Sequence, residues 1–428
     1  MPTNPYKHME EAWGLEANPF PQDAVSDDEG GPYAELYPDE TLEFESKFIR
    51  GGISSGLKLA YLWSRNPSGD TGFGKTKLMR HMRSKINVDL GNTVQAEAGI
   101  REERRVPIAA AYATLNGTTA TGLYQVYYAG VADLNTSHDG ADAPLTVARN
   151  RIIDTIAKDE ATDSADVTSK AISHAVVTAR RAMAPGGVPL RPDLVTAFAA
   201  GPDYLAIALS EVTEATRMRS GMQFLDFTLA ALGAAGINHL FIFVDQLEDL
   251  ATNLGITSAK RSKEIGRIRD LLEEQPYASR LHQILTFHSS AAIKLARYWE
   301  PQRLPRFDIA PDNMSVIVEL RGMTSDDQAI DVVKAYLEVK REGSAPDELT
   351  PFEPAAISVL RAVSQGRVGI LLTKAHGLFH AAAEAGVETI NADFATGFFS
   401  GTLNGAPADG HYEPVAVATG IDDLLLGQ

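Results

Sequence analysis

Residues 69–76 have the spacing G-x-x-x-x-G-K-[ST] of a phosphate-binding loop, and they follow the apolar run 59–63. Glycines allow the chain to wrap tightly and to direct backbone N–H groups at phosphates, and the helix expected over 75–86 adds its positive N-terminal end. Lys75 is expected to reach the β- and γ-phosphates, and the Thr76 hydroxyl to ligate Mg²⁺. The predicted nucleotide-binding residues are Gly69, Asp70, Thr71, Gly72, Phe73, Gly74, Lys75 and Thr76.

Asp245 is a second candidate for nucleotide chemistry, because it directly follows the apolar run 240–244. Aromatic and β-branched residues without alternation are typical of a strand that is buried on both faces of a parallel sheet. A carboxylate at the end of such a strand can hold the water shell of Mg²⁺ opposite the Thr76 hydroxyl. The predicted metal residues are therefore Thr76 and Asp245.

The residue that activates the attacking water has two candidates. Glu248 would polarise the water, whereas Gln246 would orient it, as a glutamine does in some GTP-hydrolysing switches. Because Gln246 occupies the position directly after Asp245, a third alternative is a site that binds ATP and hydrolyses it slowly.

The composition excludes several classes of protein. The 428-residue chain is 44% hydrophobic and has no Cys, which excludes disulfides, thiolate zinc sites and a Cys nucleophile. No apolar run approaches the roughly 20 residues of a membrane-spanning helix, and the first residues lack the pattern of a signal peptide. We therefore expect a soluble cytoplasmic protein without membrane contact.

The charge balance limits contact with nucleic acid. The chain has 39 Lys and Arg against 56 Asp and Glu, a formal net charge of -17. The summed field opposes binding to DNA, RNA or anionic membranes, so any DNA contact must be local. Basic clusters occur at 101–105 and 260–269, but neighbouring acids favour solvated helix faces.

The apolar runs predict a P-loop NTPase fold, which is a three-layer αβα domain around a parallel sheet. Between the second and third expected strands lies an interval longer than one crossover helix needs. Its Ala-rich helical patterns predict a helical insertion over about residues 130–228. The strands are expected at 59–63, 106–115, 240–244, 282–287 and 315–320.

Four regions are expected along the chain. Residues 1–39 form an irregular N-terminal arm whose aromatic side chains pack on the core, and residues 40–321 form the P-loop domain. A helix-start signal near residue 325 opens an all-α lid domain over 322–400. Residues 401–428 are rich in Gly, Ala and Pro and predict a flexible tail, with partner docking as the alternative.

Several of these motifs together resemble an AAA+ ATPase. They are the phosphate loop, the strand before Asp245, the polar segment 286–290 and the segment 364–367 before a long Ala-rich helix. The Asn-Pro-Phe at 18–20 makes the chain similar to origin-recognition ATPases and bacterial transposition ATPases. The segment 244–249 also resembles the Asp-Gln-hydrophobic-Glu box of STAND signalling ATPases.

The resemblance implies roles for several polar residues. Thr286 or Ser289 would be the first sensor of the γ-phosphate, with His288 as the alternative. Arg367 would be the second sensor, carried by the lid; alternatively it only begins a surface helix. An arginine finger for a neighbouring subunit is also implied, and surface charge is the alternative role of its candidates. These candidates are Arg297, Arg303 and Arg306.

The function expected from these residues is that of an AAA+-type ATPase. It would bind and hydrolyse ATP with Mg²⁺ and drive assembly or remodelling with protein partners on DNA, in phage defence, a mobile element or replication. A homo-oligomer or a hetero-complex with operon partners is expected. The alternatives are a STAND-like nucleotide-gated signalling switch and a slow-turnover scaffold subunit; the biological setting rests on family analogy alone.

Overall fold

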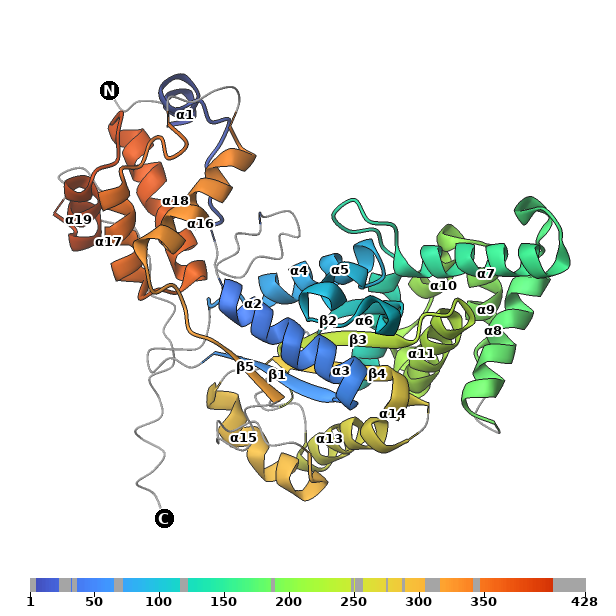
Figure 1. Cartoon of the computed structure of the whole chain (residues 1–428). Coiled ribbons are helices and arrows are strands. Elements are labelled where there is room, and N and C mark those ends of the chain that lie inside the picture. Colours follow the sequence, from blue (N-terminus) through green and yellow to red (C-terminus); the bar gives the residue numbers. More distant parts are fainter. Residues whose placement is uncertain are drawn as a thin grey trace, which may run out of the picture. The chain divides into compact units, whose positions relative to one another are not determined.

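The chain forms two compact units in a computed structural model (Figure 1). Tyr37–Arg321 is one unit, and Met1–Leu36 joins Gly322–Gln428 in the other. No helix in the described part of the chain is long and apolar enough to cross a membrane. The structure describes residues 5–22, 32, 37–64, 72–115, 122–185, 189–247, 250, 257–274, 276–286, 289–304, 316–341 and 347–402, with the backbone alone at 218 and 289–293.

The larger unit is built on a five-stranded sheet in the order β2-β3-β4-β1-β5, and every neighbouring pair is parallel. The predicted α/β class and parallel sheet are confirmed. The strands differ by one or two residues at their ends from those expected, and Asp245 is the last residue of its strand rather than the residue after it. The strands are β1 (Leu59–Ser64), β2 (Ile108–Thr114), β3 (His239–Asp245), β4 (Leu281–Thr286) and β5 (Ile317–Leu320).

One face of the sheet is covered by the helices around the phosphate loop. Phe44 packs its ring edge-on against Phe243 of β3, and the Asn87 side chain bonds both backbone groups of Ala110 on the edge strand β2. Covering an edge strand in this way blocks pairing with another chain. The helices of this face are α2 (Pro38–Phe44), the π-helix η1 (Glu45–Arg50), α3 (Gly51–Ser55), α4 (Lys75–Val88) and α5 (Asn92–Glu97).

Alternate residues of the same strands point to the opposite face. There Tyr61, Ala111 and Ile242 join one large core with a second set of helices, and Figure 1 shows α13 and α15 on the side of the sheet away from α4. Burial on both faces explains why the strands are continuous apolar runs. The helices here are α6 (Leu123–Leu134), α11 (Glu214–Ala234), α13 (Ser258–Glu273) and α15 (Ser289–Trp299), with the short α14 (Tyr277–Arg280) and η4 (Glu300–Gln302).

The long interval between β2 and β3 is helical, as predicted. Its outer helices project from one end of the sheet (Figure 1). A buried ion pair ties them to the domain: Arg180 of α8 lies 3.3 Å from Asp226 of α11, which also accepts a hydrogen bond of 2.6 Å from Tyr277. The outer helices are α7 (Pro144–Glu160), η3 (Ser164–Asp166), α8 (Ser169–Met183), α9 (Pro192–Ala200) and α10 (Pro202–Ser210).

The second unit is all-α, and the described N-terminal residues belong to it. Trp13 donates to the carbonyl oxygen of Glu388 at 3.0 Å, and the Phe20 ring packs against Tyr336, Phe352 and Phe379. The aromatic side chains of the predicted arm 1–39 pack on C-terminal helices, and residues 5–13 form a helix where the sequence analysis expected irregular structure. The helices are α1 (Pro5–Trp13), α16 (Asp326–Val339), α17 (Pro354–Ser364), α18 (Val368–Ala385) and α19 (Ala392–Ser400).

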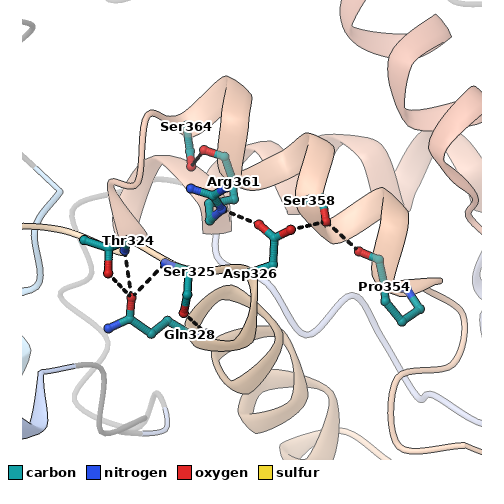
Figure 2. A network of polar contacts seen from close by, with 8 residues as sticks. All are labelled: Thr324, Ser325, Asp326, Gln328, Pro354, Ser358, Arg361 and Ser364. Carbon is teal, nitrogen blue, oxygen red and sulfur yellow. Dashed lines mark hydrogen bonds and ion pairs between the residues drawn. The ribbon is translucent and has the colours of Figure 1, made fainter.

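Helix α16 begins with a capping box, and the next residue, Asp326, contacts α17 (Figure 2). The Ser325 hydroxyl accepts from the N–H of Gln328, whose side chain in turn accepts from the N–H of Ser325. Asp326 accepts from Ser358 at 2.6 Å and from the Arg361 guanidinium, and these donors lower the pKa of its carboxyl. The helix-start signal seen in the sequence is therefore both a local cap and a tertiary contact.

Candidate nucleotide site

The candidate site lies where the carboxyl ends of four parallel strands meet. In the sheet register Thr114 of β2 pairs with Asp245 of β3, and Leu62 of β1 pairs with Thr286 of β4. Side chains alternate between faces along a strand, so Tyr112, Thr114, Asp245 and Thr286 all point to the face covered by α4. The strand order inserts β4 between β1 and β3, which places Thr286 beside both the phosphate-loop strand and Asp245.

The described part of the phosphate loop ends in a sharp turn into α4. Gly72 and Gly74 have φ values of 83° and 80°, a left-handed conformation that glycine adopts without strain. Phe73 between them is buried. Lys75 is the first residue of α4, and its ammonium donates to the Ser64 hydroxyl at the end of β1 at 2.7 Å. Gly69, Asp70 and Thr71 lie outside the described residues.

Asp245 is 5% exposed, and its carboxylate accepts four hydrogen bonds. On Oδ2 the donors are the Thr76 hydroxyl at 2.6 Å and the Tyr112 hydroxyl at 2.9 Å. On Oδ1 they are the Thr286 hydroxyl at 2.5 Å and the backbone N–H of Gln246 at 3.0 Å. Donors on both oxygens fix the plane of the carboxylate. The structure thus places Thr76 beside Asp245, the pair that the sequence analysis combined, and adds Thr286, which was predicted independently of them.

Tyr112 links this carboxylate to α4 and α6. The guanidinium of Arg80 lies over its ring, 4.9 Å from the centroid. Its backbone N–H donates to Asp133 at 2.9 Å, and Asp133 in turn pairs with Arg83 of α4 at 2.7 Å. Burial and the charge of Asp245 raise the pKa of the Tyr112 hydroxyl, while Arg80 opposes this. Tyr112 therefore stays protonated and donates across the physiological pH range.

The residue after Asp245 adopts an unusual backbone conformation. Gln246 has a φ of 58°, which is uncommon for a residue with a Cβ. Its side-chain oxygen accepts from the Thr114 hydroxyl at 3.1 Å, and the N–H of Leu247 bonds the carbonyl oxygen of Thr286 at 3.0 Å. The turn that leaves β3 is therefore held against both neighbouring strands. Glu248 lies outside the described residues.

The oxygen atoms around Asp245 suit Mg²⁺. This ion is usually held by one or two carboxylates or hydroxyls and completes its octahedron with water and substrate phosphates. One carboxylate beside one hydroxyl, at the start of the helix that follows a phosphate loop, is such a donor set. The described residues contain no group of three His, Cys, Asp or Glu side chains that could hold a metal alone. The donor set therefore fits an ion that arrives with a phosphate ligand.

The remaining predicted residues are spread over both units. Ser289 is the first residue of α15, and only its backbone is described; His288 and Arg306 lie outside the described residues. Arg297 and Arg303 are exposed at the end of α15 and just after it. Arg367 precedes α18 in the second unit and is that helix's N-cap residue.

The sequence analysis did not predict four residues of the site: Ser64, Arg80, Tyr112 and Thr114. The sequence contained a signal for three of them. Within the small apolar segment 108–114, Tyr112 and Thr114 are the side chains that carry a hydroxyl, and they are two residues apart, hence on one face. Arg80 is four residues after Thr76, one helical turn along the same face of α4.

The sequence matches no family model and no curated protein. Among solved structures, the ORC2 protein of Aeropyrum pernix in its ADP form is similar at 10% identity, with a TM-score of 0.48 over 88% of this chain and 71% of that chain. The same protein in ADPNP-ADP complexes has a TM-score of 0.44 at 10% identity, over 92% of this chain and 74% of that chain. These similarities are too weak to carry function, which rests on the contacts described above.

Proposed function

We propose that this chain is an AAA+-type ATPase that binds and hydrolyses ATP with Mg²⁺ and acts with protein partners on DNA. The observation that carries the proposal is the hydrogen bond of 2.6 Å from Thr76 Oγ1 to Asp245 Oδ2. Thr76 lies in the first turn of α4, directly after the phosphate loop, and Asp245 is the last residue of β3. A hydroxyl and a carboxylate joined in this way are the protein's share of a Mg²⁺–nucleotide site.

Each described side chain has a separate task in this proposal. Lys75 holds the β- and γ-phosphates, Thr76 and Asp245 hold Mg²⁺, and Thr286 is placed to respond to the γ-phosphate. An ion held by Thr76 and Asp245 would neutralise the negative charge that develops during phosphoryl transfer. The Thr286 hydroxyl already bonds Asp245, so a change at the γ-phosphate can reach the metal carboxylate through one side chain.

The direct test is ATP hydrolysis by the purified chain over a concentration series, with and without double-stranded DNA, together with mass photometry. The proposal expects turnover that rises with assembly or DNA. A Lys75→Ala variant measures the background. Nucleotide binding with negligible turnover under every condition contradicts the working ATPase and favours a switch or scaffold.

Water activation is assigned to Glu248, with Gln246 as the alternative. The hydrogen bond from Thr114 engages the Gln246 oxygen, which leaves its amide N–H₂ group to orient a water. Comparing Glu248→Gln with Gln246→Ala separates the two roles. A Glu248→Gln variant that hydrolyses ATP at the parent rate removes Glu248 from the mechanism.

An arginine finger that acts on a neighbouring subunit must be exposed, and Arg297 and Arg303 meet this condition. Complementation tests it: Lys75→Ala subunits keep the arginines but lack the phosphate contact, whereas Arg297→Ala subunits keep the site. If Arg297 acts in trans, mixing the two inactive variants restores part of the turnover. Mixing Lys75→Ala subunits with Arg303→Ala subunits tests the second candidate, and mixing them with Arg306→Ala subunits tests the third. Arg367→Ala separately tests the proposed second sensor.

A STAND-like switch is the second candidate function, and Gln246 favours it. A glutamine fixed by Thr114 stands next to the metal carboxylate, in the place where an acid commonly activates water. Such a protein would retain nucleotide for many minutes and change its assembly with the nucleotide bound. Slow release of the bound nucleotide, together with a rate of ATP hydrolysis below the rate of release, would support the switch over the working ATPase.

A further inference from the structure

Tyr112 reaches the candidate metal carboxylate from the edge of the sheet. Its hydroxyl shares Asp245 Oδ2 with the Thr76 hydroxyl, at 2.9 and 2.6 Å. A hydroxyl donor on the same oxygen as the phosphate-loop threonine limits rotation of the carboxylate. Since Mg²⁺ requires nearly ideal octahedral geometry, the orientation of this carboxylate matters for its affinity.

Tyr112 is itself fixed from two sides. The Arg80 guanidinium covers its ring at 4.9 Å, and among the described residues no carboxylate pairs with Arg80. On the other side Asp133 accepts the Tyr112 N–H. Arg80 lies one helical turn after Thr76, so the helix that begins at the phosphate loop carries both the metal hydroxyl and the residue that covers the tyrosine.

We propose that Tyr112 is a positioning residue for the Mg²⁺ site, which orients Asp245 through its hydroxyl and is held in place by Arg80. The inference rests on the proposed nucleotide site and adds to it a contact from the edge strand β2. Outer residues that orient a metal ligand commonly change metal affinity about 10- to 100-fold when they are removed. Tyr112 should therefore set how much Mg²⁺ tightens nucleotide binding.

The test compares nucleotide affinity with and without Mg²⁺. A fluorescent ADP analogue is titrated with the full chain in EDTA and over a series of Mg²⁺ concentrations. For Tyr112→Phe we expect the Mg²⁺ concentration of half-maximal effect to rise about tenfold, while the Kd in EDTA changes less than about twofold. Arg80→Met should shift the Mg²⁺ requirement in the same direction by a smaller factor.

Tyr127→Phe is the matched control. Tyr127 is a buried tyrosine of α6 in the same unit, and its hydroxyl has no hydrogen-bond partner among the described residues. Its removal should leave both affinities unchanged. Thermal unfolding of each variant in EDTA establishes that the fold is retained.

Three results would overturn the inference, and they differ from failure of the proposed function. Tyr112→Phe could match Tyr127→Phe, or it could weaken binding equally in EDTA and in Mg²⁺, which would indicate general packing. Arg80→Met could leave the Mg²⁺ requirement unchanged, which would remove Arg80 from the inference. If the parent chain binds the analogue no tighter with Mg²⁺ than without it, the proposed metal-dependent site fails, and the role of Tyr112 fails with it.

Discussion

The Thr286 hydroxyl donates to Asp245 Oδ1 at 2.5 Å, joining the ends of two neighbouring strands. Both side chains are almost completely buried. Replacing Thr286 with Val keeps the shape but leaves the carboxylate with one donor fewer. We expect the free energy of unfolding to fall by about 1–2 kcal/mol and ATP turnover to fall much more than nucleotide affinity.

A control for Thr286→Val is Thr228→Val. Thr228 is equally buried in α11 and bonds only the carbonyl oxygen of Phe224. Urea unfolding of this variant should show a loss of similar size without a loss of turnover. Equal turnover in the two variants would contradict the sensing role of Thr286.

Lys75 should be essential for nucleotide binding. Lys75 is buried, and its ammonium donates to the Ser64 hydroxyl at 2.7 Å. We expect Lys75→Ala to weaken ATP binding at least tenfold and to abolish hydrolysis, because the phosphates lose their nearest cation. Isothermal titration measures this. Lys77→Ala, roughly 200° around the same helix, is the control and should bind normally.

The His239–His282 pair makes stability pH-dependent. His282 Nδ1 lies 2.6 Å from the Leu57 carbonyl oxygen, and His282 Nε2 lies 2.9 Å from His239 Nδ1. Burial, reinforced by His239 and Lys58, lowers the pKa of His282 to about 4; burial and Arg280 lower that of His239. His282 therefore stays neutral in the folded chain down to about pH 4, whereas the unfolded chain binds a proton there below about pH 6.5.

The stability from His282 is complete above its unfolded pKa of about 6.5 and is lost as the pH falls toward 4. The full loss is on the order of 3 kcal/mol for a shift of this size. Urea midpoints at pH 7.5, 5.5 and 4.5 measure the slope. His282→Gln should be less stable at pH 7.5 and show a shallower pH dependence, whereas the exposed His174→Gln should follow the parent curve. A His282→Gln slope equal to that of the parent would rule out this origin.

The buried contact of Arg180 with Asp226 should make Asp226 difficult to replace on its own. Asp226→Asn leaves the Arg180 charge without a counter-charge, and we expect a loss of about 3–5 kcal/mol in the free energy of unfolding. The double variant Arg180→Met, Asp226→Leu should recover much of it, since no buried charge remains. Urea unfolding of the three proteins gives the result; a double variant as unstable as Asp226→Asn would contradict the explanation.

Gly366 should resist substitution more than another left-handed glycine of the same unit. It has a φ of 72°, and a Cβ on it would lie 2.6 Å from the Met323 carbonyl oxygen. Gly401, with a φ of 70°, has nothing within 4 Å of that position. Gly401→Ala should therefore cost only the backbone strain of about 1–2 kcal/mol, and Gly366→Ala clearly more. Hydrogen exchange in α16 and α17 measures the difference, and equal exchange rates would contradict it.

Much of the fold could be predicted because its signals are local. The apolar runs 59–63 and 240–244 predict buried strands, and the glycine spacing at 69–74 predicts a phosphate loop, from local residues alone. The capping box at Ser325 likewise depends on four consecutive residues, 325–328. These features depend on backbone geometry over a few residues, which composition and spacing encode directly.

The tertiary structure alone decided which distant side chains meet. Strand order and register bring Tyr112 and Thr286 to Asp245, and helix packing brings Arg80 over Tyr112, although no short-range pattern links these positions. The same holds for Trp13 and Phe20 of the predicted N-terminal arm: the sequence indicates that they pack on a core, and the fold shows that C-terminal helices bury them. Periodicity specifies the face of each element, but the partner of that face depends on burial and pairing summed over the whole domain.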